Sequence, residues 1–196
     1  MKVNVIMIRH AKTRGNLNHE YIGSTDESLC EIGVEELKMN GKRYPHADYI
    51  YSSPLKRCIE TAAIIYDDKK PIIENDLREC DFGDFEKMNY EQLKDREEYQ
   101  RFIDSNGEAS FPNGESKSQF SKRCIKAFEK IVINQDDGDT IAIICHGGTI
   151  MAVLHQYSNP HKDFYEWQAK NTQGFTFVFD TNIKKAIDIR RLQGES

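Results

Sequence analysis

Two short apolar runs of this sequence each end in a histidine. Residues 3–8 stop at Arg9 and His10, and residues 140–145 stop at His146. Runs of this length, rich in β-branched residues, are typical of buried strands. In open α/β sheets ligands bind at the carboxyl ends of the strands, so both histidines are expected to share one pocket. Taken alone, the Arg-His pair could equally mark the point where a strand reaches solvent.

Three further features suit the same pocket. Arg57 falls in the first turn of a predicted helix that follows a strand ending at Ser53, and Glu79 lies in an irregular segment able to cover the site. The Gly147-Gly148 step lets the backbone approach a ligand, and it opens a helix whose N–H groups favour an anion. Guanidinium groups match phosphate oxygens, an imidazole can accept a phosphoryl group, and a carboxylic acid can protonate the leaving oxygen. The set predicts phosphoryl transfer.

Competing chemistries lack their motifs. A Walker P-loop is absent. A cysteine-phosphatase loop starting at Cys145 would need arginine at position 151, where the sequence has Met151. A metal hydrolase would place several carboxylates near the histidines, whereas arginine is their recurring neighbour. We therefore expect neither a metal nor another cofactor.

Alternating strands and helices position these residues. We expect strands at 3–8, 48–52, 71–74 and 140–145, helices at 32–43, 55–66, 89–102, 116–133 and 149–156, and a terminal hairpin of 174–180 with 185–190. Pro54 behind Ser53, a serine able to cap, marks one helix start. This order predicts an α/β fold with a largely parallel sheet. No repeat or linker divides the chain, so residues 1–196 are expected to form a single domain.

The composition is that of an ordinary polar-surfaced protein. The 196 residues are 38% hydrophobic and 30% charged, with a net charge of -5 and a pI of about 5.7. An acidic balance argues against a nucleic-acid or acidic-membrane binder, but it leaves room for a small anionic substrate in a local positive pocket. The five cysteines are scattered singly, which indicates reduced thiols rather than a disulfide framework. With no leader or membrane span in the sequence, we expect a cytoplasmic protein.

Together the motifs resemble the histidine phosphatase superfamily, also called phosphoglycerate-mutase-like. They occur in the family's order and cover about residues 3 to 155: Arg9-His10-Ala11-Lys12-Thr13-x-x-Asn16, Tyr21-x-Gly23-x-x-Asp26, Ser52-Ser53-Pro54-Leu55-x-Arg57, Leu77-Arg78-Glu79-x-x-Phe82-Gly83 and His146-Gly147-Gly148-Thr149-Ile150. The resemblance implies a three-layer α/β/α sandwich, with one antiparallel strand in a mostly parallel central sheet.

The resemblance also implies a role for each matching residue. His10 would be the phosphorylated nucleophile and Glu79 the acid and later the base. The phosphoryl oxygens would be held by Arg9, Asn16, Arg57 and His146, with the backbone at Gly23 and Gly147. Departures from the family pattern are Ala11 and Lys12, where glycine and glutamate are common, and Met151, where many relatives carry arginine.

The sequence favours a phosphatase over a mutase of this family. Mutases of this family carry a longer insertion after the acid segment, with an arginine pair and a proline-rich stretch, whereas residues 87–118 are short and lack both. The predicted activity is therefore a metal-independent phosphomonoester hydrolase acting through phosphohistidine on a small metabolite, with α-ribazole phosphate, phosphoserine or a broad substrate range left open. A cofactor-dependent phosphoglycerate mutase and a weakly catalytic phospho-ligand-binding regulator remain the alternatives. The chain is expected to act as a monomer or a homodimer.

Overall fold

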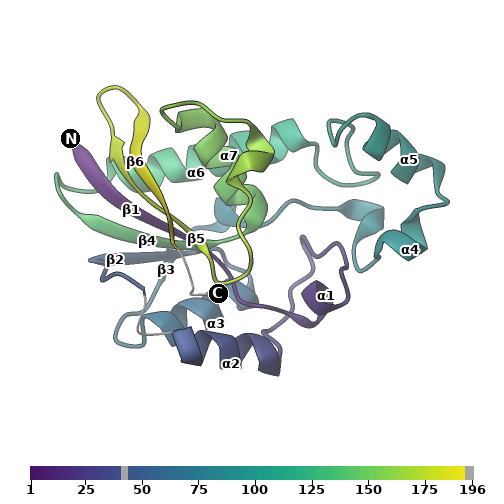
Figure 1. Cartoon of the computed structure of the whole chain (residues 1–196), viewed down its shortest axis with the longest axis horizontal. Coiled ribbons are helices and arrows are strands. Elements are labelled where there is room, and N and C mark those ends of the chain that lie inside the picture. The colour runs from purple at the N-terminus through teal and green to yellow at the C-terminus, as the bar shows by residue number, and fades with distance from the viewer. Residues whose placement is uncertain (41–43, 193–196) are drawn as a thin grey trace.

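A six-stranded sheet forms the centre of the computed structural model, which describes residues 1–40 and 44–192 (Figure 1). Its strands are β1 (Lys2–Arg9), β2 (Tyr49–Ser52), β3 (Ile72–Ile73), β4 (Thr140–Cys145), β5 (Gly174–Asp180) and β6 (Lys185–Leu192), in the order β3-β2-β4-β1-β5-β6. Only β5 runs against its neighbours. The predicted mostly parallel sheet with one antiparallel strand is therefore confirmed.

Helices lie on both sides of this sheet, which confirms the predicted three-layer sandwich. Figure 1 shows α6 (Lys117–Ile133) and α7 (Gly147–Tyr157) on one side, with α2 (Glu31–Asn40) and α3 (Lys56–Ile65) on the other. Within β1, Val5 and Met7 pack toward α6 and α7, whereas Ile6 and Ile8 pack toward α3. Both faces are covered, so the central strands are apolar almost throughout.

The remaining short elements lie beyond the carboxyl ends of β1 and β4, at the right of Figure 1. They are α1 (Arg14–Leu17), α4 (Tyr90–Leu93) and α5 (Glu97–Asp104). The chain also forms the 3₁₀ turns η2 (Asn75–Leu77), η3 (Gly83–Phe85) and η4 (Phe164–Trp167), of which η2 contacts α6 and η4 contacts α7. A separate apolar cluster that includes Phe85, Leu93, Tyr99 and Phe111 holds much of this region together. This cluster lies beside the end of the sheet.

Several element boundaries differ from the sequence prediction. The segment 89–102 forms two short helices, α4 and α5, with α4 starting at an Asn89–Gln92 capping box. Helix α7 begins at Gly147, two residues earlier than predicted, because glycines in the first turn do not interrupt a helix stabilised by later packing. Strand β6 continues to Leu192, two residues beyond the predicted end of the hairpin. Positions 41–43 of the predicted helix 32–43 lie outside the described residues.

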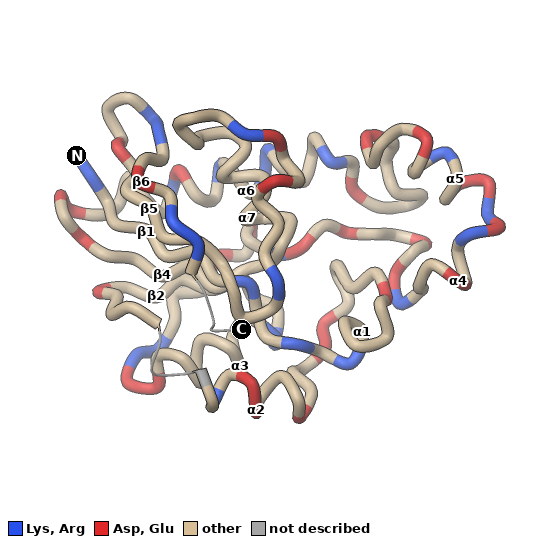
Figure 2. Tube along the Cα trace, viewed as in Figure 1, with Lys and Arg blue, Asp and Glu red and all other residues tan. Residues whose placement is uncertain are grey.

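Charged residues of both signs alternate over the outer helices and loops (Figure 2). No helix in the described part of the chain combines the length and apolar character needed to cross a membrane.

Candidate active site

The pairing of β1 with β4 brings the two predicted histidines together. Their parallel register aligns Arg9 with Cys145, and the N–H of His10 continues the ladder by donating to the carbonyl oxygen of Cys145 at 3.0 Å. The next residue on each chain segment is therefore a histidine. The rings of His10 and His146 meet edge to face with their centroids 5.2 Å apart.

His10 presents one ring nitrogen with a free lone pair. Its Nδ1 lies 2.7 Å from the carbonyl oxygen of Ala11. A carbonyl can only accept, so we assign the proton to Nδ1 and the lone pair to Nε2. Burial, followed by the charges of Arg57 and Arg9, lowers the pKa of His10 well below its usual range. A neutral imidazole with a free nitrogen is competent as a nucleophile at neutral pH.

Arg9 and Arg57 each hold a buried guanidinium nitrogen without a partner. Nη1 of Arg9 donates to the carbonyl oxygen of Ala169 at 2.9 Å, and the two Nη atoms of Arg57 donate to carbonyls of residues 22–25. The Nε atoms of both arginines are buried and have no acceptor among the described residues. A buried donor left unpaired costs about 1–3 kcal/mol. An anion at this edge of the sheet is the kind of ligand that would pair with them.

His146 is fully buried, and its partner is Ser53. Its Nε2 lies 2.8 Å from the Ser53 hydroxyl oxygen. The sequence predicted a capping role for this serine, but the observed N-cap of α3 is Leu55, which makes no side-chain capping bond. The Ser53 hydroxyl is only a distant acceptor, 3.4 Å from the N–H of Leu55. Because β2 lies beside β4, the hydroxyl reaches His146 instead and orients its ring.

Glu79 lies against the start of α7. Its Oε1 accepts from the N–H of Cys80 at 3.0 Å, and its carboxylate also accepts from the N–H of Gly148. A Cβ at Gly148 would sit 2.7 Å from Oε1 of Glu79 and 2.9 Å from the Phe120 ring, so only glycine permits this approach. Burial raises the pKa of Glu79 above its usual range, against the opposing pull of these N–H groups and of Arg57. A carboxyl group with a raised pKa suits general acid catalysis.

Asn171, which the sequence analysis missed, fixes the amide of Asn16. Its Nδ2 donates to the carbonyl oxygen of His10 at 3.0 Å and to Oδ1 of Asn16 at 3.1 Å. The N–H of Thr13 donates to the same Oδ1 at 3.2 Å. The oxygen of Asn16 is thus occupied, which leaves its NH₂ group for a ligand. Asn171 lies 155 residues along the chain from Asn16, so no local pattern could reveal it.

Glu86 is a second residue that the sequence reasoning did not single out. Its carboxylate accepts from the N–H of Gly23 at 3.1 Å, from the N–H of Ser24 at 2.8 Å and from the Thr25 hydroxyl at 2.7 Å. Carbonyls of the same loop accept from Arg57, at 2.8 Å for Gly23 and 2.7 Å for Thr25. Glu86 is therefore connected to Arg57 through the peptide groups of residues 22–25. Its only sequence signal is an acid in the irregular segment after Glu79.

The surroundings of Gly23 differ from the expected phosphate contact. Its N–H donates to Glu86, and a Cβ at this position would overlap the carbonyl oxygen of Cys80. Close packing of two backbone segments therefore accounts for the glycine in this structure.

These groups open into a cavity of about 480 Å³ at the carboxyl ends of β1 and β4. The predicted site residues divide into two sets, those that line the cavity and those behind its lining. The first set is Arg9, His10, Asn16, Glu79 and Gly147, and the second is Gly23, Arg57 and His146.

Two departures from the family pattern are accommodated without disturbing the cavity. Ala11 is buried and keeps a negative φ. The Lys12 ammonium lies 2.5 Å from Oε1 of Glu36, so its charge is paired rather than directed into the cavity or left free in solvent.

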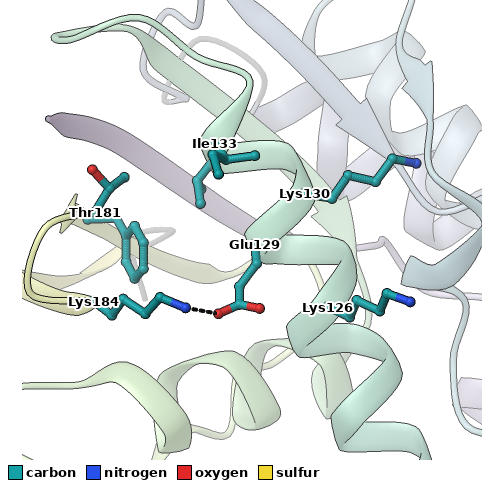
Figure 3. Close-up of a pocket in the computed structure, with 8 residues that line it drawn as sticks. Lys126, Glu129, Lys130, Ile133, Thr181 and Lys184 are labelled. Atoms are coloured by element: carbon teal, nitrogen blue, oxygen red, sulfur yellow. Dashed lines mark hydrogen bonds and ion pairs between the residues drawn. The ribbon is translucent and has the colours of Figure 1, made fainter.

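A different hollow lies between α6 and the turn that joins β5 to β6 (Figure 3). Lys184 pairs with Glu129 there at 2.9 Å, and Lys130 pairs with Glu74 at 2.7 Å. Its cations are thus largely paired, and its described lining contains neither histidine nor arginine. We place the chemistry at the strand ends.

Comparison with known proteins gives one family. The model of the histidine phosphatase superfamily (branch 1) matches residues 5–186. A broad-specificity phosphatase from Saccharomyces cerevisiae is 31% identical over 204 residues, covering 97% of this chain and 85% of its own. A 2,3-bisphosphoglycerate-dependent phosphoglycerate mutase from Cytophaga hutchinsonii is 31% identical over 160 residues, covering 76% of this chain and 75% of its own.

Among solved structures, a mutant of phosphoserine phosphatase from Entamoeba histolytica, in complex with phosphoserine, superposes with a TM-score of 0.81. It is 26% identical and covers 97% of this chain and 98% of its own.

Proposed function

The chain belongs to the histidine phosphatase superfamily, and from this premise we propose that it hydrolyses small phosphomonoesters through a phosphohistidine formed on Nε2 of His10. The observation that carries the proposal is the state of His10, which is neutral and has Nδ1 bonded to Ala11. We also infer that residues 1–196 act as one domain.

In the first step Nε2 of His10 attacks the phosphorus atom and forms an N–P bond. The bond between phosphorus and the ester oxygen breaks, and its electron pair stays on that oxygen. Glu79, whose burial raises its pKa and so favours the protonated form, donates a proton to the departing oxygen. Arg9 and Arg57 stabilise the negative charge on the phosphoryl oxygens, and the amide of Asn16 adds a neutral donor.

In the second step the Glu79 carboxylate takes a proton from water. The water oxygen attacks phosphorus, the N–P bond breaks, and its electron pair returns to Nε2 of His10. Free phosphate and the original protonation states result. His146 stays beside His10, held by Ser53; burial and the charge of Arg57 lower the pKa of His146 well below its usual range, so it supports the site as a neutral ring.

Two alternatives differ in what happens after phosphorylation. A phosphoglycerate mutase would return the phosphoryl group to a second oxygen of its substrate, and relatives with that name are as similar as some named phosphatases. A regulatory protein would bind phosphoesters without turnover. The intact set of nucleophile, acid and cations supports catalysis, and the short segment 87–118 supports hydrolysis.

Phosphate release from phenyl phosphate in excess EDTA tests the proposal. Wild type should release phosphate, and quenching with alkaline denaturant during turnover should reveal an alkali-stable, acid-labile phosphoryl group on the protein. His10→Ala should lose both signals. His46→Ala, which removes an exposed histidine outside the site, should keep them. Equal activity of wild type and His10→Ala would refute the assignment of the nucleophile.

A further inference from the structure

The part of the cavity away from His10 has an aromatic lining. Seven aromatic side chains from several segments line the cavity: Tyr21, Phe82, Phe102, Phe111, Phe120, Phe164 and Tyr165. The cavity, at about 480 Å³, is far larger than a phosphate group and falls in the size range of pockets that enclose a small organic molecule. The aromatic part is therefore where the alcohol portion of a phosphoester would lie.

The aromatic lining is already packed in the structure. The rings of Phe82 and Phe111 have their centroids 4.9 Å apart, and those of Phe102 and Phe111 are 4.6 Å apart. Phe111 also meets the buried ring of Phe85 edge to face. Because the rings hold one another, the surface offered to a ligand is preorganised, which lowers the entropy cost of binding.

The lysine at this part of the cavity is already paired. Lys117 lies 2.6 Å from Oε1 of Glu108, and its ammonium sits over the Phe164 ring at 4.6 Å. Glu20 accepts from the side-chain amide of Asn18 at 2.9 Å. Among the described lining residues, therefore, no cation beyond the catalytic end is free to meet a carboxylate on the substrate.

Two classes of phosphoester should therefore differ in how favourably they bind to this aromatic surface. A carboxylate placed against these rings would lose its hydration without gaining a free cation as partner, which is costly. An apolar body of similar size would gain from the removal of its surface from water. Resting on the proposed function, we propose that the substrate is the monophosphate of an uncharged alcohol with a flat apolar or aromatic body, rather than a phosphorylated amino acid or hydroxy acid.

Three esters of primary alcohols test this proposal with little change at the reacting oxygen: 2-phenylethyl phosphate, ethyl phosphate and phosphoserine. We expect kcat/KM for 2-phenylethyl phosphate to exceed that for ethyl phosphate by on the order of 10- to 100-fold, from burial of one phenyl ring. The value for phosphoserine should lie near or below that for ethyl phosphate. A preference for phosphoserine, or equal values for all three, would overturn the inference and leave the hydrolase proposal standing.

If no phosphate is released from any of these esters or from phenyl phosphate, both the hydrolase proposal and this inference are overturned.

Met151, on α7, supplies the matched variants because it also lines the cavity. Met151→Lys adds a cation to the apolar lining, and Met151→Leu keeps its character. The measured quantity is the ratio of kcat/KM for 2-phenylethyl phosphate to that for phosphoserine, which is independent of the fraction of folded enzyme.

We expect Met151→Lys to lower this ratio about tenfold, because the cation would pair with the carboxylate of phosphoserine. Met151→Leu should change the ratio less than about threefold, as for a volume-conserving apolar exchange. A ratio unchanged by Met151→Lys would show that the alcohol portion does not occupy this part of the cavity, and would overturn the inference.

Discussion

Replacement of Glu86 by glutamine should reduce turnover, although Glu86 does not line the cavity. Its Oε2 accepts from the N–H of Gly23 at 3.1 Å, and from the N–H and hydroxyl of Thr25 at 3.3 and 2.7 Å. Glu86→Gln replaces this carboxylate oxygen with an NH₂ group, which cannot accept from the Thr25 N–H, whereas the Gly23 N–H keeps its contact with Oε1 at 3.1 Å. The loop 22–25, which carries the carbonyls that hold Arg57, then loses part of its anchor.

The expected loss of kcat in Glu86→Gln follows from these contacts. One unsatisfied donor costs about 1–3 kcal/mol when buried, and the loop is only partly buried, so we expect a cost of about 1 kcal/mol for the Thr25 N–H. Complete loss of one preorganised donor in a site costs about 10²- to 10³-fold in kcat. Arg57 remains present in Glu86→Gln but is held less firmly. We therefore expect kcat to fall about 10- to 100-fold.

A double-mutant cycle identifies the cause. Arg57→Ala should lower kcat for phenyl phosphate by about 10²- to 10³-fold. In that background Glu86→Gln should lower kcat less than about threefold further, because the loop no longer has a guanidinium to hold. Asp84→Asn is the matched control: its carboxylate bonds the exposed side chain of Asn113 away from the cavity, so kcat should change less than about twofold. Equal losses from Glu86→Gln in both backgrounds would refute the connection between Glu86 and Arg57.

Three further predictions concern the acid, the nucleophile and the residue that orients Asn16. Glu79→Gln should slow hydrolysis of alkyl phosphates much more than that of 4-nitrophenyl phosphate, because only a poor leaving group needs the proton; equal losses would argue against its acid role. A pH profile of kcat/KM should rise through the depressed pKa of His10, below 6.5, since the nucleophile must be unprotonated, and fall through the raised pKa of Glu79, above 4.5. In Glu79→Gln the falling limb should vanish, and its persistence would assign that limb to another group. Asn171→Ala should lower kcat about tenfold. Asn171→Asp should lower kcat further, because the new carboxylate oxygen would face two acceptor oxygens, the His10 carbonyl oxygen and Oδ1 of Asn16. An Asp variant as active as wild type would show that Asn171 does not orient the Asn16 side chain.

The central apolar strands and the residues at their ends could be predicted from the sequence because both are local. A run such as 140–145 is apolar whatever lies next to it, and a histidine directly after it must emerge at a strand end. The parallel arrangement then follows from the alternation of strands with helices. The register that pairs Arg9 with Cys145 then places His10 beside His146.

What surrounds those residues was decided only by tertiary contacts. The sequence predicted the Ser53 hydroxyl as a helix cap, but the position of β2 beside β4 makes it the partner of His146 instead. Glu86 and Asn171 act through hydrogen bonds to groups 61 to 63 and 155 to 161 residues away, and no pattern along the chain specifies such distances.

The sequence by itself thus predicted the three-layer fold, the family and the candidate nucleophile and acid. The tertiary structure decided the protonation state of His10, through burial and the Ala11 carbonyl, and the aromatic lining of the cavity, through the packing of segments from separate parts of the chain. The physical reason is that residue type and spacing fix local geometry, whereas pKa values and cavity shape depend on which distant groups exclude water from the same volume.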